Sequence, residues 1–231
     1  MRTIGLIGGM SWESTAWYYR LINERVRALR GPLCSADLLL HSVDFEPVER
    51  LQREGRWDEA GRLLAASAQR LDAAGAQAIA LCTNTMHRVA GAIEEATARP
   101  FLHIADAAGA ALQAAGVTTV GLLGTRFTME QDFYAARLQR TFGIATVTPE
   151  LAERQEIHRV IYEELCAGKI MASSRDAYLH ILDALARRGA QAALLACTEI
   201  MMLLRDVQAP LPLFDTTSLH ANACVAFALD G

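Results

Sequence analysis

The stretch GAQAIALCTNT at residues 75–85 recurs as GAQAALLACTE at residues 189–199. In each copy a glycine ends an Ala-rich helical pattern, an apolar run follows, and polar residues end the run. Eight positions separate Gly75 from Thr83, and eight separate Gly189 from Cys197. A short apolar run between such boundaries is typical of a buried strand in a parallel sheet. The repeat therefore predicts two α/β halves in which Thr83 and Cys197 occupy equivalent positions.

A second matched pair of segments supports this duplication. IGLIGG at residues 4–9 resembles VGLLGT at residues 120–125. The offset between these segments is 116 residues, and the offset between the two GAQA segments is 114 residues. Ala-rich joints between helices and strands can look alike, but two matches at nearly the same offset favour homologous halves related by a pseudo-twofold axis.

Apolar runs alternate with helical patterns along the chain, which favours parallel sheets built from right-handed βαβ units. Helices are expected at about 58–74, 128–143 and 174–188, and the second is expected to begin with a capping box of Thr128 and Gln131. Strands are expected at 3–7, 37–41, 77–81, 119–123, 192–196 and 211–214.

The expected fold is two similar parallel-sheet α/β domains with the active site in the cleft between them. The first domain comprises residues 1–100 and is completed by residues 211–231, and the second comprises residues 101–210. Ligands of open parallel sheets bind beyond the carboxyl ends of the strands. If the halves face each other, Thr83 and Cys197 meet across a cleft. Racemisation needs one group on each face of Cα, because one removes the proton and the other returns one.

The composition excludes several classes of protein. Of 231 residues, 52% are hydrophobic and 21% are charged, which is typical of a soluble globular chain. The net charge is -4 and no basic cluster outweighs its acidic neighbours, so we expect no nucleic-acid partner. No stretch resembles a membrane span or a secretion signal, so we expect no membrane partner and a cytoplasmic location. Five cysteines without CxxC spacing predict free thiols.

The sequence also predicts a protein without a cofactor or metal. Lys169 is the only lysine, so a Schiff base to a carbonyl cofactor could form only there. Gly8 and Gly9 lack the spacing of a dinucleotide loop, so a nicotinamide site is not expected. His and Cys residues never fall at the spacing of zinc ligands, so no metal is expected either.

Several motifs together resemble those of one family. They are GGMSWEST at residues 8–15, NTMH at 84–87, GT at 124–125, ACTE at 196–199, FDT at 214–216 and HA at 220–221. In combination they resemble the aspartate/glutamate racemase family, which is independent of pyridoxal phosphate. The resemblance implies an isomerase of amino acid metabolism with two α/β domains and an active site between them. It also implies an amino acid as substrate, no cofactor, and a homodimer.

The family carries a cysteine pair as its two bases, and this sequence departs from that pattern at one position. Cys197 matches the second family cysteine, whereas Thr83 stands in place of the first. Cys82 lies one residue earlier, and because strand residues alternate faces, its side chain is expected to point away from the cleft. Thr83 and Cys197 are therefore the expected catalytic residues.

The threonine at position 83 predicts a preference for one enantiomer of the substrate. An unassisted threonine hydroxyl is too weak an acid to exist as an alkoxide at neutral pH, so it donates or relays a proton more readily than it abstracts one. In the family the second cysteine takes the proton from the L-enantiomer. The resemblance therefore implies activity on L-glutamate or L-aspartate, and slow activity, if any, on the D-acid.

The same resemblance implies a set of substrate-binding residues. These are Met10, Gln52, Asn84, Thr85, Thr125, Lys169, Thr198 and Glu199. The donors among them suit the α-carboxylate, with capping of strand ends as the alternative. Gln52 and Lys169 match regions where the family holds the side-chain carboxylate, with an ordinary exposed residue as the alternative.

Other polar residues near the motifs have structural interpretations. Ser11 and Ser14 are expected to cap the next helix, whose N-terminus would attract a carboxylate. Asp215 is expected to cap the last helix, and His87 to support the motif structurally.

Two other functions fit the same residues. Related superfamily members with one cysteine decarboxylate or isomerise small dicarboxylates such as malonate derivatives and maleate, and Cys197 would be the single strong base of such a reaction. The remaining alternative is a carboxylate-binding protein that has lost turnover. Exchange of the Cα proton with solvent would distinguish a racemase from that protein.

Overall fold

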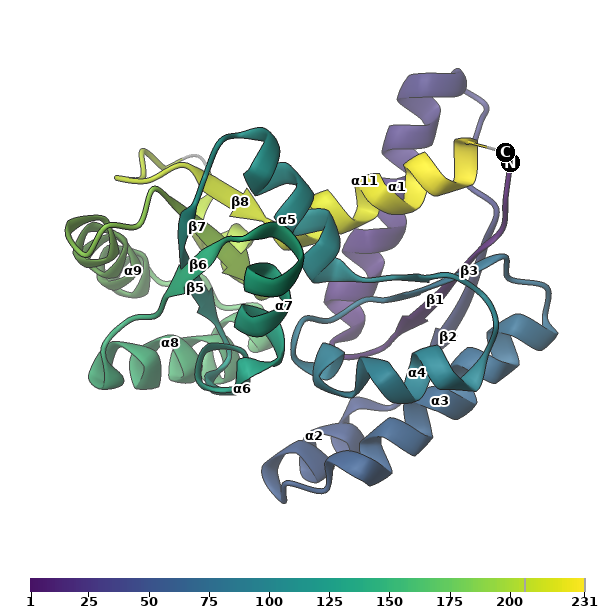
Figure 1. Ribbon diagram of the computed structural model, residues 1–231, viewed down its shortest axis with the longest axis horizontal. Helices are drawn as coiled ribbons and strands as arrows, with labels where there is room; N and C mark the ends of the chain where they lie inside the picture. Colours follow the sequence, from purple (N-terminus) through teal and green to yellow (C-terminus); the bar gives the residue numbers. More distant parts are fainter. Residues whose placement is uncertain (206, 231) are drawn as a thin grey trace. The chain divides into compact units, whose positions relative to one another are not determined.

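The computed structural model describes residues 1–205 and 207–230 and contains two parallel four-stranded sheets. The first sheet has the order β2-β1-β3-β4 and the second the order β6-β5-β7-β8, so raising each strand number by four converts one into the other (Figure 1). The first sheet comprises β1 (Ile4–Gly8), β2 (Leu38–Ser42), β3 (Ala78–Leu81) and β4 (Phe101–Leu102). The second comprises β5 (Thr119–Gly124), β6 (Ala145–Val147), β7 (Ala192–Ala196) and β8 (Leu213–Asp215).

The strand register repeats along with the strand order. Ile4 lies opposite Ala78 in the first sheet, and Val120 lies opposite Ala192 in the second. These partners are the positions that the offsets of 116 and 114 residues match in the sequence. The prediction of two similar parallel-sheet α/β halves is therefore confirmed.

Two strands and one helix start were not predicted correctly. β4 and β6 have two and three residues, which is too short to produce a recognisable apolar run. The helix expected at 128–143 is divided into α6 (Arg126–Glu130) and α7 (Asp132–Phe142). Thr125 caps α6 by accepting a hydrogen bond from the Thr128 amide, so the capping box expected at Thr128 and Gln131 is wrong.

Helices cover both faces of the first sheet. Ile7 and Leu81 point to the face covered by α3, and Leu6 and Ala80 point to the face covered by α1 and α11. These strands are buried on both sides, which explains why they have apolar residues at consecutive positions. The elements of this region are α1 (Trp12–Arg30), α2 (Phe45–Arg53), α3 (Trp57–Ala73), the 3-10 helix η1 (Thr85–Val89), α4 (Ala90–Ala96) and α11 (Thr216–Leu229).

The second sheet is also covered by helices. Leu123 and Leu195 point into an apolar cluster with Ile157 and Tyr178, which belong to α8 and α9. Besides α6 and α7, the elements of this region are α5 (Ile104–Ala114), α8 (Leu151–Glu163), the 3-10 helix η2 (Leu165–Ala167), α9 (Ala172–Arg187) and α10 (Ile200–Leu204). No helix within residues 1–205 and 207–230 is long and apolar enough to cross a membrane.

The last helix of each repeat belongs to the unit of the other repeat. One compact unit comprises Met1–Ile104 and the residues from His220 onward, and the other comprises Ala105–Leu219. α5 follows β4 but packs in the second unit, where the ring of Phe142 leaves no room for a Cβ at Gly109. α11 follows β8 but places Cys224 and Val225 in the apolar cluster of the first unit.

The observed units differ from the expected domains at two places. The first boundary falls after residue 104 rather than after residue 100. Residues 211–219 belong to the second unit rather than the first, because Leu213 and Phe214 pair with β7. From residue 220 onward the chain is part of the first unit, where the sequence analysis placed it.

The exchanged helix α11 provides a test of this arrangement. Val225 is buried and the next residue, Ala226, is exposed. Val225→Asp should lower the free energy of unfolding by about 3 kcal/mol or more, since it places a carboxylate in the apolar cluster. Ala226→Asp should cost less than about 1 kcal/mol, because only helix propensity changes.

Urea unfolding measures both changes, and hydrogen exchange locates them. We expect Val225→Asp to increase exchange in β1 and β3, which share its cluster. Equal losses of stability in the two variants would contradict the packing of α11 on the first sheet.

Candidate active site

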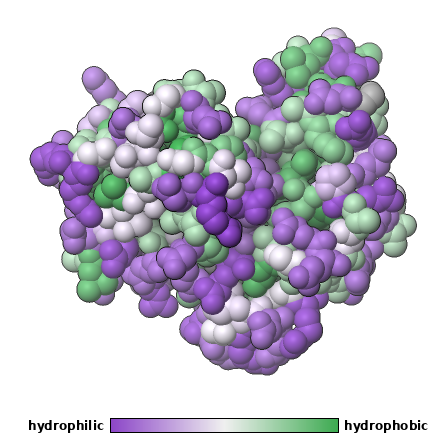
Figure 2. Space-filling view, viewed as in Figure 1, coloured by the Kyte–Doolittle hydropathy of each residue, from purple (hydrophilic) through white to green (hydrophobic). Residues whose placement is uncertain are grey.

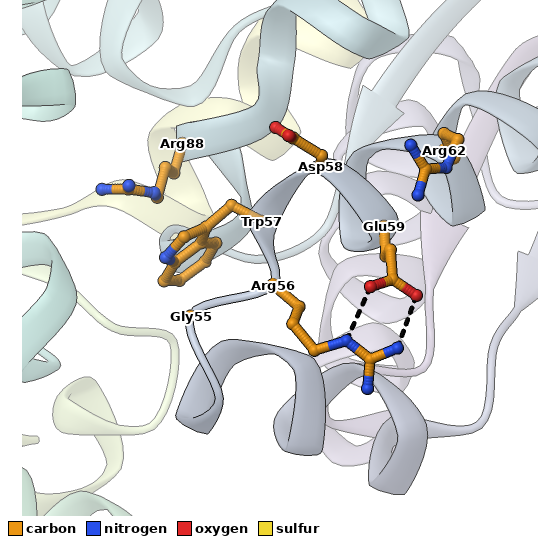
Figure 3. A pocket seen from close by; sticks show the side chains of 7 residues that line it. All are labelled: Gly55, Arg56, Trp57, Asp58, Glu59, Arg62 and Arg88. Atoms are coloured by element: carbon orange, nitrogen blue, oxygen red, sulfur yellow. Dashed lines mark hydrogen bonds and ion pairs between the residues drawn. The ribbon is translucent and has the colours of Figure 1, made fainter.

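Two surface cavities of the first unit are lined by residues outside the predicted site. One has a volume of about 490 Å³ and lies at the turn between α2 and α3, where the Arg88 guanidinium lies 4.4 Å from the ring centre of Trp57 (Figure 3). The other has a volume of about 450 Å³ and lies beside the end of β2, with His41 and Arg70 in its lining. Most of the predicted residues lie instead in the loops that follow β1, β3, β5 and β7, whereas Gln52 belongs to α2 and Lys169 follows η2.

The loop after β1 contains the residue that caps the N-terminus of α1. Gly9 has a φ of 96°, and a side chain there would collide with the backbone of Val43. Ser11 caps α1 by accepting a hydrogen bond from the Ser14 amide, as expected. Met10, between them, is buried. The partial positive charge at the N-terminus of this 19-residue helix favours a carboxylate nearby.

Thr83 follows β3 and is held through its backbone by His87. The His87 Nδ1–H donates to the Thr83 carbonyl at 2.7 Å, and its Nε2 accepts from the Ile104 amide at 3.2 Å. This pair of bonds fits a neutral imidazole with its proton on Nδ1. His87 is buried, and its contacts agree with the structural role expected for it. The side chain of Thr83 itself is half-buried.

Cys82 is adjacent to Thr83 in the sequence but has a different environment. It is fully buried in the cluster that contains Ile4, Tyr18 and Cys224. Burial raises the pKa of the Cys82 thiol well above its usual value, and the charge of Cys224 adds to this effect. Cys82 is therefore a core thiol.

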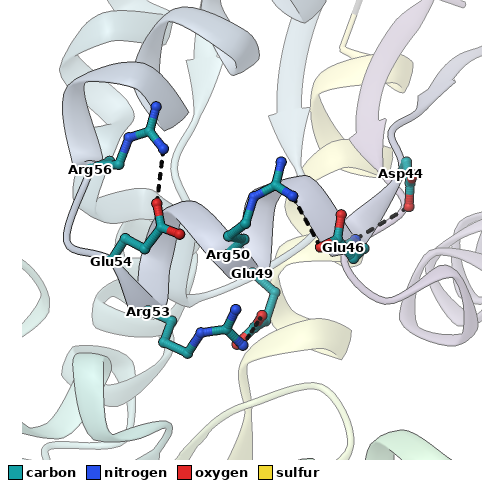
Figure 4. Close-up of polar contacts among 7 residues, drawn as sticks. All are labelled: Asp44, Glu46, Glu49, Arg50, Arg53, Glu54 and Arg56. Atoms are coloured by element: carbon teal, nitrogen blue, oxygen red, sulfur yellow. Dashed lines mark hydrogen bonds and ion pairs between the residues drawn. The ribbon is translucent and has the colours of Figure 1, made fainter.

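α2 turns one polar side chain inward. Its exposed side carries ion pairs at i,i+4 spacing, Glu46 with Arg50 and Glu49 with Arg53 (Figure 4). The space-filling view shows a mostly hydrophilic surface over this part of the chain (Figure 2). Exposed pairs of this kind contribute little to stability, so their main effect here is to keep this side in water. Gln52 lies on the opposite, buried side of the helix.

Gln52 reaches the loop after β3. Its amide Nε2 donates to the sulfur of Met86 at 2.9 Å, and its side chain is 3% exposed. The interpretation of Gln52 as an ordinary exposed residue is therefore wrong. Asn84 and Thr85 are also buried in this loop. The first unit thus gathers buried amide and hydroxyl side chains in the loop after β3 and on the helix that contacts it.

The second unit places Thr125 and Cys197 at the ends of neighbouring strands. Gly124 of β5 and Ala196 of β7 are register partners, and Thr125 and Cys197 are the residues that follow them. Both side chains are buried. The Thr125 hydroxyl accepts from the Thr128 amide, so capping accounts for one of its contacts.

Cys197, Thr198 and Glu199 form a hydrogen-bonded cluster. The Cys197 thiol donates to Oε2 of Glu199 at 3.1 Å, and the Thr198 hydroxyl donates to the same oxygen at 2.6 Å. All three side chains are buried, with Cys197 7% and Glu199 5% exposed. Thr198 therefore binds Glu199, whereas the sequence predicted a contact with the substrate.

The surroundings of Cys197 favour the protonated thiol. Burial raises its pKa well above the usual value, and the negative charge of Glu199 raises it further, with a smaller contribution from Cys166. The buried Tyr178 lies in the same apolar cluster and donates its hydroxyl proton to the Ile157 carbonyl. A thiolate at this position therefore needs an assisting group.

Lys169 and Asp215 have different relations to this cluster. Lys169 is exposed and lies just after η2. η2 contacts α10, and α10 starts directly after Glu199. Asp215 accepts hydrogen bonds from the amides of Thr217 and Ser218, so it caps α11 as expected.

The sequence analysis missed some of the buried polar residues around the motifs. Tyr18 donates to Nδ1 of His220, whose Nε2–H donates to the Leu102 carbonyl. His220 was quoted only as part of a motif, and Tyr18 and Tyr178 lie in helical patterns that indicate core positions. Within the described part of the chain, no three His, Cys, Asp or Glu side chains are grouped as a metal ion would require.

The predicted residues thus form two groups, one in each unit. Met10, Gln52, Thr83, Asn84 and Thr85 belong to the first unit. The second unit holds Thr125, Lys169, Cys197, Thr198 and Glu199. The expected meeting of Thr83 with Cys197 across a cleft stays a prediction.

Comparison with known proteins identifies the class of enzyme. Residues 7–224 match the family model described as Asp/Glu/Hydantoin racemase. Because the match extends over nearly the whole chain, the protein belongs to the Asp/Glu/Hydantoin racemase family and is an isomerase.

Solved structures agree with this assignment. A candidate Asp/Glu racemase from Yersinia pestis is 49% identical with a TM-score of 0.93, over 99% of this chain and 100% of that one. An aspartate racemase homologue from Pyrococcus horikoshii OT3 is 30% identical with a TM-score of 0.85, over 99% of both chains. A variant of arylmalonate decarboxylase is 18% identical with a TM-score of 0.55, over 100% of this chain and 94% of that one, and shares the fold alone.

The two hydrogen bonds of His87 predict that it stabilises the loop that contains Thr83. His87→Ala would leave the Thr83 carbonyl and the Ile104 amide without their present partner, so we expect a loss of about 2 kcal/mol or more in unfolding free energy. Urea denaturation measures this loss. Arg88→Ala is the control, because it removes an exposed neighbour whose contact with Trp57 contributes about 1 kcal/mol or less. Similar losses in both variants would contradict the proposed support of Thr83.

Proposed function

We propose that the protein racemises aspartate or glutamate without a cofactor, with Cys197 and Thr83 as the two proton-transferring groups. The observation that carries the proposal is their equivalent position in the two repeats. Thr83 is the second residue after β3 and Cys197 is the first residue after β7, and each lies eight positions after the glycine that begins its repeat. The relatives described as an Asp/Glu racemase candidate and an aspartate racemase homologue support the choice of acidic substrates. The homodimer and the cytoplasmic location stay predictions.

The two groups differ in acid–base chemistry, and this difference makes exchange of the Cα proton with solvent unequal for the two enantiomers. Cys197 as a thiolate removes the Cα proton of the L-enantiomer and becomes a thiol. The Thr83 hydroxyl then passes a proton from water to the opposite face of Cα. In the reverse direction Thr83 would have to remove a proton, and a neutral hydroxyl is a poor base. We therefore propose that the L-enantiomer is preferred in exchange of the Cα proton, and that net racemisation is slow from either enantiomer because both directions include the step at Thr83.

The remaining predicted residues have roles in binding. Asn84 and Thr85 supply donors to the α-carboxylate, and the N-terminus of α1 stabilises its negative charge. Such donors also stabilise the extra charge that forms on the carboxylate when Cα loses its proton. Gln52 and Lys169 are proposed to hold the side-chain carboxylate, and Met10 and Thr125 to complete the binding site.

Exchange of the Cα proton in D2O tests the proposal. Wild-type protein incubated with L-aspartate or L-glutamate should incorporate deuterium at Cα and form the D-enantiomer, without added pyridoxal phosphate. Cys197→Ser should lower the rate at least about 100-fold, because it removes the base. Cys82→Ser should change it little, because Cys82 is a core thiol. A larger loss in Cys82→Ser would show that Cys82 is the reacting residue.

Thr83→Cys tests the proposed preference for one enantiomer. A thiol with a pKa of ~8.5 supplies a few per cent thiolate at neutral pH, so deuterium incorporation into D-aspartate or D-glutamate should rise. Incorporation into the L-acid depends on Cys197 and should change less. The same NMR measurement follows both enantiomers. Equal incorporation into both by the wild-type protein would contradict the preference, because Thr83 would already act as a base.

The alternative reactions are tested in the same experiment. A decarboxylase would release CO2 from a malonate derivative, and an isomerase would convert maleate into fumarate. A binding protein without turnover would retain the amino acid with no deuterium at Cα. Any of these results without exchange at Cα would replace the racemase proposal.

A further inference from the structure

We propose that Glu199 is the proton acceptor that converts the Cys197 thiol into the thiolate base, and that it does not bind the substrate. The inference rests on the proposed function, in which Cys197 removes the Cα proton. Glu199 would act through Cys197, so it is a positioning residue that holds the thiol proton during turnover.

The geometry provides the path for this proton. The Cys197 Sγ–H donates to Oε2 of Glu199 at 3.1 Å. The two residues are two positions apart in the turn after β7, where the Ile200 amide donates to the Cys197 carbonyl at 3.2 Å. Both side chains are at least nine-tenths buried, so water does not compete freely for this bond. The proton can therefore move along a hydrogen bond that already exists.

Charge conservation favours this acceptor over solvent. If water took the proton, the buried cluster would hold a thiolate and a carboxylate, and this repulsion is one reason why the thiol pKa is raised. When Glu199 takes the proton, the S–H bond breaks, its electron pair stays on sulfur, and an O–H bond forms. The pair carries one negative charge before and after the transfer, so no second charge is buried.

Neighbouring groups do not offer the same chemistry. The Tyr178 hydroxyl of α9 donates to the Ile157 carbonyl, and Cys166 of η2 is itself a thiol. The Thr198 hydroxyl donates to the same oxygen of Glu199 as the thiol. The raised pKa of Cys197 and the direction of its hydrogen bond both leave the proton on sulfur.

Alkylation of the substrate-free protein tests the inference independently of racemase activity. Iodoacetamide is added between pH 6 and 9, and mass spectrometry follows the peptide that contains Cys197. With an internal acceptor the wild-type rate should be nearly constant around neutral pH, because no proton leaves the pair. In Glu199→Gln the rate at pH 7 should be at least about tenfold lower, and it should rise with pH as solvent removes the proton.

The competing roles of Glu199 predict different results. If Glu199 acts only through its charge, Glu199→Gln removes the repulsion, lowers the thiol pKa and speeds alkylation at pH 7. If Glu199 only binds substrate, the alkylation rate stays unchanged and the KM for the amino acid rises. Either result would overturn the inference. Glu164→Gln is the matched control, because Glu164 is a carboxylate of the same unit that binds Ser174 and Arg159 instead of the thiol. Its alkylation rate should equal that of the wild-type protein.

A second variant decides the question if Glu199→Gln does not fold. Glu199→Asp keeps the charge but shortens the side chain by one methylene, so the wider gap to Sγ should slow alkylation at pH 7. An unchanged or faster rate would overturn the inference. Failure of the proposed function is recognised separately: alkylation would follow the expected pattern while neither aspartate nor glutamate exchanged its Cα proton.

Discussion

Burial of the central strands on both faces is the constraint on which the rest of this structure depends. Every residue of β1, β3 and β7 is buried, so each sheet needs helices on two sides. In the first unit α3 covers one face, and α1 with α11 covers the other. Polar side chains are consequently excluded from the middle of the sheets and gather where the strands end. The position of the candidate site follows from this exclusion.

The two repeats use equivalent strand ends in different chemical ways. In the first, His87 binds the backbone carbonyl of Thr83 and not its hydroxyl. In the second, Glu199 binds the thiol of Cys197 itself, so the contact involves the proton of the atom that we propose to react. Duplication supplied one geometry twice, and side chains a few positions beyond each strand made the copies unequal. An enzyme of this kind can favour one face of a substrate although its framework is nearly symmetric.

The sequence predicted the elements with long apolar runs and the caps with local signals. Ser11 and Asp215 act within a few residues of their own positions, so their roles could be inferred. The bond between Cys197 and Glu199 could not, because contact at a spacing of two residues depends on the backbone of the turn. The return of the chain to the first unit was expected, but residues 211–219 were assigned there as well, because a short apolar run does not show which sheet it joins.

The exchanged helices have a consequence for synthesis on the ribosome. Ile4 of the first strand emerges early, but Val225, which shares its apolar cluster, follows 221 residues later. At ordinary translation speeds this interval is about 10 to 45 s, during which one face of the nascent sheet lacks part of its cover. The second unit is contiguous from Ala105 to Leu219, so it can close before the first. The half of the chain that is made first thus needs the segment that is made last to complete its apolar cluster.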